Sequence, residues 1–149
     1  MKIERFDRVV IVVKDIEESM KFFSDVFGIK FDEVGGSDIM GVDAVYSEVG
    51  IELMSPRTDQ GPIAQYLQKR GEGLYALAFK VSNLEEAMKE AESKGIRSLG
   101  VLDMGPMKEG MLHPKDTHGT LIILTEYQAR HPVTATVLID ELKKKLGEK

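Results

Sequence analysis

Residues 8–21 read RVVIVVKDIEESMK, and the same pattern returns at residues 76–89 as ALAFKVSNLEEAMK. Each copy is an apolar run, a polar turn and a helix of about three turns that a glycine ends. Asp15 and Asn83 stand at N-cap positions, and two glutamates follow each of them where negative charge suits the helix dipole. A repeat spaced by about half the chain is too long for a solenoid. The sequence therefore predicts a duplicated module.

Each copy opens a module with the predicted order βαβββ. The first module contains a strand at 5–13, a helix at 16–27, a strand at 29–34, a loop at 35–38, and strands at 42–49 and 51–54 that turn near Gly50. The second module contains a strand at 74–81, a helix at 84–94, and strands at 98–102, 107–113 and 120–125. This order predicts an α+β fold.

Two further segments lie outside the modules. An irregular bridge at 57–72 carries a short helix at 63–69 that Pro62 begins, and Pro132 opens a last helix that runs to about Leu146 with an apolar stripe. We therefore expect one domain at 1–128, with modules at about 5–56 and 73–126, followed by a helical extension at 129–149.

Composition narrows the class of protein. The 149 residues are 42% hydrophobic and 30% charged, which is typical of one compact domain with a real core. The chain has no cysteine, no apolar run of about 20 residues and no recognisable signal peptide, so we expect a soluble, cytoplasmic protein without membrane contact. A net charge of −5 with scattered basic residues argues against nucleic acid as the main partner.

Three segments carry a resemblance to a known family. They are GIELMSP at 50–56, GPIAQYLQKRGEGL at 61–74 and LHPKDTHG at 112–119. Together with the repeat, they resemble the vicinal-oxygen-chelate superfamily of glyoxalases, bleomycin-resistance proteins and extradiol dioxygenases, and most of all its methylmalonyl-CoA epimerase branch. The resemblance covers about residues 5–125. It implies that the two modules form a cupped mixed sheet, that the ligand lies in the cleft between them, and that the protein is a homodimer.

The resemblance also implies four positions for metal ligands, on the first and last strands of each module. The family carries histidine, glutamine or glutamate, histidine and glutamate there, and these positions are Arg8, Glu52, Ala76 and Ile123 in this chain. Only Glu52 has a donor atom for a metal, and Arg8 is a permanent cation that repels one. One carboxylate cannot hold a divalent ion against water. We therefore predict no metal site and no cofactor.

Among these four positions, Arg8 is the most specific candidate for a functional residue. Alternation along its strand places Arg8 and Val10 on one face and Val9 and Ile11 on the other. A buried, unpaired arginine costs several kcal/mol, so Arg8 needs a partner. The resemblance makes Glu52 the nearest candidate, and two interpretations stay open. Arg8 and Glu52 form a closed pair that fills the old metal site, or Arg8 binds a ligand carboxylate through its bidentate fork.

Four other residues are candidates for ligand contacts, each beside a plainer interpretation. Met54 fits an adaptable apolar pocket or simply the core. Tyr75 offers a phenolic donor, although alternation from Ala76 turns it toward the helix layer. Lys115 suits a coenzyme A phosphate or a solvated basic surface, and His113 suits a ligand or loop packing. His118 stands where the relatives carry glycine, which predicts a left-handed turn position or a solvent-facing ring.

Three functional hypotheses follow. The first is a metal-free protein that binds a small acyl or carboxylate ligand in the cleft between the modules. The second is an active isomerase or lyase of the epimerase or glyoxalase type, acting on a coenzyme A thioester or a 2-oxo compound with Glu52 as the one catalytic candidate. The third is a structural or regulatory subunit whose last helix docks a partner. The donors missing at Ala76 and Ile123 count against the second hypothesis.

Overall fold

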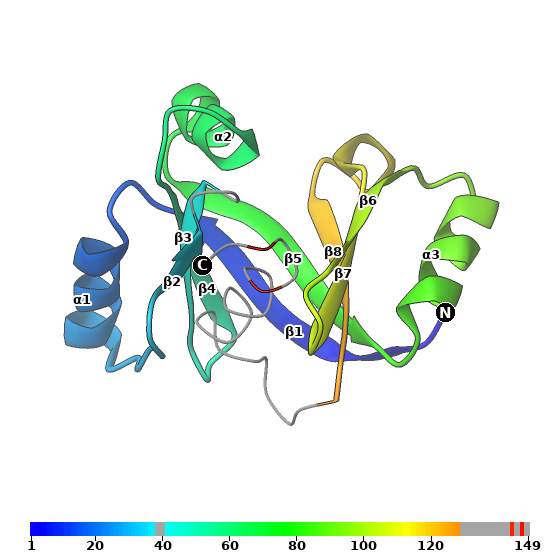
Figure 1. The fold of residues 1–149 in the computed structure, drawn as a ribbon, viewed down its shortest axis with the longest axis horizontal. Helices are drawn as coiled ribbons and strands as arrows, with labels where there is room; N and C mark the ends of the chain where they lie inside the picture. Colours follow the sequence, from blue (N-terminus) through cyan, green and yellow to red (C-terminus); the bar gives the residue numbers. More distant parts are fainter. Residues whose placement is uncertain (38–40, 129–143, 145–146, 148–149) are drawn as a thin grey trace.

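In the computed structural model, which describes residues 1–37, 41–128, 144 and 147, an eight-stranded sheet curls into an open cup (Figure 1). The elements of the first half are β1 (Ile3–Val12), α1 (Ile16–Phe27), β2 (Gly35–Ser37), β3 (Val42–Tyr46) and β4 (Ile51–Pro56). After α2 (Pro62–Arg70), the second half comprises β5 (Gly73–Val81), α3 (Leu84–Ser93), β6 (Ser98–Asp103), β7 (Met107–Leu112), the short 3₁₀ helix η1 (Pro114–Asp116) and β8 (Leu121–Tyr127).

The sheet is built from two halves with the same internal pairing. The strand order is β2-β3-β4-β1-β5-β8-β7-β6, with β1 parallel to β4, β5 parallel to β8, and β1 antiparallel to β5 at the centre. Each half therefore has the order βαβββ, as the repeat predicts. The register pairs Val10 with Glu52 in the first half and Ala78 with Ile123 in the second.

The two long helices begin where the repeat predicts. The Asp15 carboxylate accepts a hydrogen bond from the Glu18 backbone N–H at 2.9 Å, and the Asn83 side chain accepts one from Glu86 at 3.0 Å. These caps satisfy backbone donors that the first helical turn leaves unpaired. Gly28 follows α1 with a positive φ of 69°, a left-handed conformation that glycine adopts without strain. In this conformation its backbone N–H donates to carbonyl oxygens of the last helical turn.

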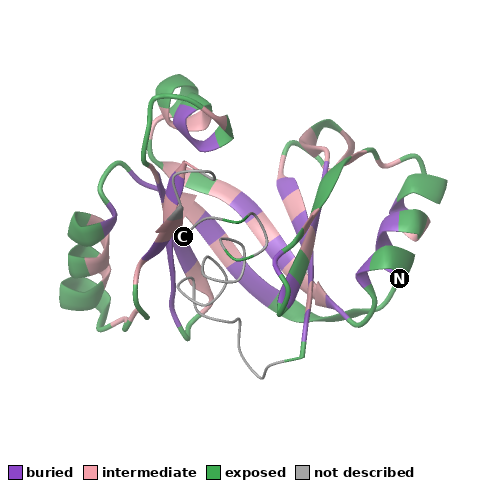
Figure 2. Ribbon diagram, viewed as in Figure 1, coloured by how far each residue is buried: buried purple, intermediate pink, exposed green. Residues whose placement is uncertain are grey.

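The helices α1 and α3 cover the outer, convex side of the sheet, whose concave side faces the open cup. The shorter α2 lies at the rim of the cup, where its Ile63 packs against Val12 and Val42. Ile16 of α1 packs against Val45 and Leu53, while Leu84 and Met88 of α3 belong to a separate core over the second half. Figure 2 shows the buried residues concentrated on the central strands, with the outward faces of α1 and α3 exposed. None of the helices in the described residues is long and apolar enough to cross a membrane.

One predicted strand and one predicted loop are wrong. Residues 29–34 are not a strand: Phe31 makes only an isolated bridge to Ser47, and its side chain packs instead in the core beneath α1. The strand begins later, as β2, in the glycines that we expected to form a loop, and Gly36 pairs with Asp43. The apolar residues at 29–34 pack in the core without pairing as a strand. The β2 residues pair with β3 through their backbone groups and need no apolar side chains. The helix predicted at 132–146 lies outside the described residues.

Candidate functional site

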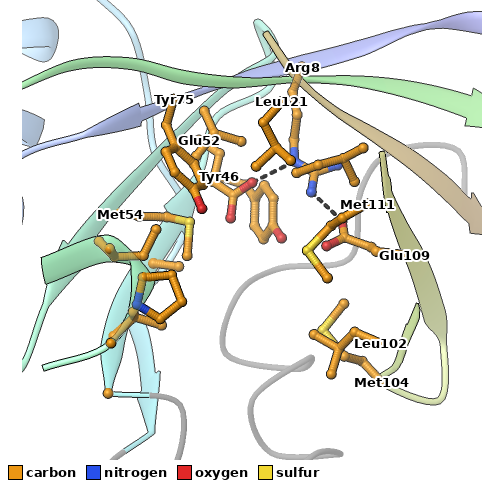
Figure 3. Close-up of a pocket in the computed structure, with 18 of the residues that line it drawn as sticks. Arg8, Tyr46, Glu52, Met54, Tyr75, Leu102, Met104, Glu109, Met111 and Leu121 are labelled. Carbon is orange, nitrogen blue, oxygen red and sulfur yellow. Dashed lines mark hydrogen bonds and ion pairs between the residues drawn. The ribbon is translucent and has the colours of Figure 1, made fainter. Parts of the chain in front are cut away.

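A cavity of about 250 Å³ opens on the concave side between the two halves (Figure 3). Its walls are mainly apolar and come from both halves of the sheet. Prominent among them are Val10, Ala44, Met54, Leu102, Met104, Met111, Leu121 and Ile123. Among the described residues, the charged ones that line it are Arg8, Glu52 and Glu109. They gather at its floor, so the cavity is apolar around an ionic base.

Arg8 is the centre of this floor and is only 1% exposed. Its Nε donates to Glu52 Oε2 at 2.6 Å, its Nη1 donates to Asp7 Oδ2 at 2.7 Å, and its Nη2 donates to Glu109 Oε1. The guanidinium also lies 5.1 Å from the centroid of the Tyr46 ring, within the range of a cation–π contact. All three guanidinium nitrogens of Arg8 therefore have a carboxylate partner, and the predicted proximity of Arg8 and Glu52 is confirmed.

The register of the central strands explains how Arg8 reaches so many partners. Arg8 pairs with Ala78 on β5, and Ala78 in turn pairs with Ile123 on β8. Because Ala78 ends at its Cβ atom, the long arginine side chain can extend along the curved sheet to Glu109 on β7. Glu52 stands on the other neighbour of β1, so the guanidinium lies between the two glutamates (Figure 3).

A bulge in β1 adds a third carboxylate that simple alternation hides. The register moves from Phe6 opposite Phe79 to Arg8 opposite Ala78, which leaves Asp7 as an extra residue. A bulge of this kind turns a side chain away from its alternating direction. Asp7 is buried beside Arg8, and its Oδ1 accepts hydrogen bonds from Tyr127 and, at 3.1 Å, from Arg5.

A second bulge redirects Tyr75. The register shifts between Val10 opposite Ala76 and Ile11 opposite Leu74, so Tyr75 has no partner on β1. Tyr75 packs with Ala76 in the same core cluster and lines the cavity, and the expectation that it faces the helix layer is wrong. The reason is the extra residue in β5, which interrupts the alternation between neighbouring side chains.

Burial shifts the acid–base properties of the floor. Burial raises the pKa of Glu52 above its usual value, Arg8 opposes this shift, and the nearby charge of Glu109 adds to it. Burial and then the Glu52 charge raise the Tyr46 pKa well above its usual range. Burial alone would lower the Arg8 pKa, but its carboxylate partners outweigh that effect and raise it. Arg8 therefore stays a cation, and Tyr46 stays a neutral phenol.

The residues at the four family ligand positions do not fit a divalent metal ion. The Arg8 guanidinium already donates to Glu52, and Ala76 and Ile123 contribute only carbon atoms. Among the described residues, no three His, Cys, Asp or Glu side chains are grouped so that they could hold an ion. A cation at this place would also face the positive charge of Arg8.

The remaining predicted contact residues divide between two cavities. Met54 and Tyr75 line the first cavity with Arg8 and Glu52, whereas His113 and Lys115 line a second one of about 570 Å³. Tyr75 and Leu121 line both, so the cavities adjoin. The His113 ring accepts a hydrogen bond from the Lys115 backbone N–H at 3.1 Å through Nδ1 and caps η1, as the loop-packing interpretation expects.

Sequence reasoning missed three residues that contact Arg8: Asp7, Tyr46 and Glu109. A usable signal existed for Glu109, because alternation along 107–113 places it on the same face as Met107 and Met111. A lone carboxylate between two apolar neighbours of one strand face indicates a paired or functional acid. Asp7 gave no such signal, since its inward direction depends on the bulge.

Comparison with known proteins places this fold and site in a family. The model of the Glyoxalase/Bleomycin resistance protein/Dioxygenase superfamily matches residues 5–124. The mitochondrial methylmalonyl-CoA epimerase of Mus musculus is 32% identical over 132 residues, which cover 84% of this chain and 74% of that protein. The crystal structure of the Mycobacterium tuberculosis methylmalonyl-CoA epimerase has a TM-score of 0.78 and 28% identity, and the match covers 86% of this chain and 91% of that one. The chain therefore belongs to the Glyoxalase/Bleomycin resistance protein/Dioxygenase superfamily, and it is similar within it to the methylmalonyl-CoA epimerases.

Proposed function

We propose that this protein binds a small acyl ligand in the cavity between its two halves without the help of a divalent metal. One observation carries the proposal. The position of the first family metal ligand is held by Arg8, whose three guanidinium nitrogens all donate to carboxylates at the base of an otherwise apolar cavity. The place that the family resemblance assigns to a metal ion is therefore taken by a side chain of the protein, already paired with carboxylates.

The surroundings of Arg8 favour an acyl group over an acidic one. A ligand carboxylate that approached the guanidinium would also approach Glu52 and Glu109, which line the same cavity. Like charges at close range in a partly desolvated site repel one another strongly. Apolar walls such as Met54 and Met111 instead stabilise the carbon chain of a ligand by removing it from water.

The second cavity supplies a place for a charged carrier of such an acyl group. It adjoins the first at Tyr75 and Leu121, and it is lined by Arg70 and Lys115. These cations suit the phosphates of a coenzyme A thioester, the ligand class named for several relatives. On this basis the acyl end lies in the first cavity and the anionic carrier in the second.

A metal-independent isomerase is the second candidate, and one observation favours it. Glu52 and Glu109 lie on either side of Arg8, so two carboxylates flank the cation. In such an arrangement a carboxylate can take a proton next to a carbonyl group while the guanidinium stabilises the resulting negative oxygen. Glu52 is then joined by Glu109 as a candidate for proton transfer.

Ligand-induced stabilisation tests the binding proposal. We expect propionyl-CoA to raise the melting temperature of the purified protein, because a ligand that binds only the folded state stabilises it. Met54→Trp, which fills the first cavity, should remove this rise. Val49→Trp, at an exposed position outside both cavities, is the matched control and should keep it. If propionyl-CoA shifts neither the wild-type protein nor the control, the proposal is wrong.

Solvent deuterium exchange separates the two candidates. For methylmalonyl-CoA, we expect exchange at the α-carbon to be undetectable or about 10²- to 10⁴-fold slower than in an efficient enzyme, since a positioned acid or base commonly contributes that much. Mass spectrometry of the recovered thioester measures the exchange. Incorporation of deuterium at an enzymatic rate, lost in Glu109→Gln, would establish the isomerase instead of a binding protein.

A further inference from the structure

The floor of the first cavity carries more negative than positive charge. Among the described residues that line the cavity, Arg8 is the one cation, and it faces both Glu52 and Glu109. The third carboxylate, Asp7, does not correct the balance, because it is shared between Arg8 and the neighbouring Arg5. The whole network therefore contains two guanidinium groups and three carboxylates.

One of these carboxylates, Glu109, has an oxygen that a ligand in the cavity can reach. The Glu109 carboxylate accepts a hydrogen bond from Arg8 through Oε1. Within the described part of the chain, no hydrogen bond reaches its other oxygen, Oε2. Both glutamates line the cavity, and the Glu109 side chain is the more exposed of the two, at 13% against 6% for Glu52. A ligand entering the cavity therefore meets a carboxylate with a free acceptor oxygen.

We infer that the group of the ligand that reaches this floor is a protonated amine, carried on a small apolar or acyl body. The inference rests on the proposed binding function of the same cavity and adds the charge of the ligand. An ammonium group beside Glu109 completes the charge balance of the network and donates to the free oxygen. Because the Glu109 side chain is mostly buried, salt screens this attraction less than it would at the surface.

The rest of the lining suits such a ligand. The methionines Met54, Met104 and Met111 provide a soft apolar wall for a carbon chain. The Tyr75 ring, also in the lining, presents an aromatic surface on which a cation is tolerated. A neutral end group would leave the negative charge of the floor uncompensated, and an anionic end group would add to it.

Three amides of matched length test the charge directly. They are hexanamide, aminopentanamide with its amine at the far end, and the monoamide of adipic acid, which end in a methyl, an ammonium and a carboxylate group. Titration calorimetry at fixed ionic strength should find the amine at least about tenfold tighter than the methyl compound, the value of one charge-assisted hydrogen bond. The carboxylate should bind more weakly than either.

Glu109→Gln should bring the affinity for the amine down toward that of hexanamide, while Glu48→Gln, an exposed carboxylate outside the cavity, should keep the preference. The wild-type comparison stands even if Glu109→Gln fails to fold. If hexanamide binds and the amine has no advantage, if the carboxylate binds most tightly, or if propionyl-CoA binds and the amine does not, the inference is wrong and the binding function stands. If none of the three amides binds, and propionyl-CoA does not bind either, the proposed function itself fails.

Discussion

The two halves of the sheet have the same topology but contribute opposite chemistry to the cavity. The register aligns Glu52 of the first half with Ile123 of the second, and the repeat aligns Arg8 with Ala76. An ion pair in one half therefore corresponds to two apolar side chains in the other. In the same alignment, Glu109 of the second half corresponds to Ala44 of the first.

The difference teaches how a duplicated sheet can hold a buried arginine. A lone ion pair inside one half would leave most donors of the guanidinium unsatisfied, and burial would then cost several kcal/mol. Small and apolar residues in the second half, such as Ala78, leave space for the arginine, and Glu109 supplies the partner that the first half lacks. The network thereby joins the two halves across the cavity.

Removal of Arg8 should have the largest effect on the stability of this network. We expect Arg8→Ala to destabilise the fold by about 3–5 kcal/mol, because three carboxylates lose a shared buried partner. Glu52→Ala should cost less, since Arg8 keeps Asp7 and Glu109. Urea midpoints of the two variants measure both losses. A larger loss in Glu52→Ala than in Arg8→Ala would contradict the shared network.

A double variant checks the coupling within the first half. Arg8→Met combined with Glu52→Leu makes these positions apolar, like their counterparts in the second half. Because neither member of the pair remains as an orphan, the combined loss should be smaller than the sum of the single losses. Strictly additive losses would show that the two side chains act independently and that their contact contributes nothing to stability.

The opposite experiment makes both halves polar. Arg8→His, Ala76→His and Ile123→Glu, together with the native Glu52, restore the donor set that the family resemblance implies. Co²⁺ or Zn²⁺ should then stabilise the triple variant by about 2.7 kcal/mol at about a hundred times the dissociation constant. The wild-type protein is the control, and its melting temperature should not respond to either ion. One tightly bound ion per wild-type chain would refute the absence of a metal site.

Much of the fold was predictable because it depends on local patterns and their repetition. The caps at Asp15 and Asn83 and the face that carries Arg8 follow from side-chain chemistry and alternation. The contact of Arg8 with Glu52 needed one more step, the family resemblance, because pairing between distant strands leaves no local mark in a sequence.

The missed features share a physical cause: the backbone departs from regular alternation. The extra residues at Asp7 and Tyr75 each turn a side chain into the cup, and no propensity of aspartate or tyrosine announces a bulge. The strand at Gly35–Ser37 was missed for a related reason, since its glycines pair through backbone groups alone. These are tertiary effects, and only the assembled sheet determines them.

The connections that lead into the last strand of each half also differ. The first half turns through residues 47–50 and uses Gly50, with a φ of 81°, whereas the second uses the longer loop 113–120, in which His118 has a φ of 55°. A side chain in this left-handed region costs about 1–2 kcal/mol, which glycine avoids. The prediction that His118 occupies such a position is confirmed.

His118→Gly should therefore stabilise the protein slightly and make the second connection resemble the first. Glycine relieves the strain, but the greater freedom of the unfolded chain lowers the free energy of unfolding by about 0.5–1 kcal/mol. The net gain in stability should therefore be at most about 1 kcal/mol. His118→Ala is the matched control: it removes the same exposed ring but keeps the Cβ atom, and it should bring no gain. Urea midpoints at unchanged slope measure both effects. An equal gain in both variants would mean that the ring, rather than the backbone conformation, is the unfavourable element in this loop.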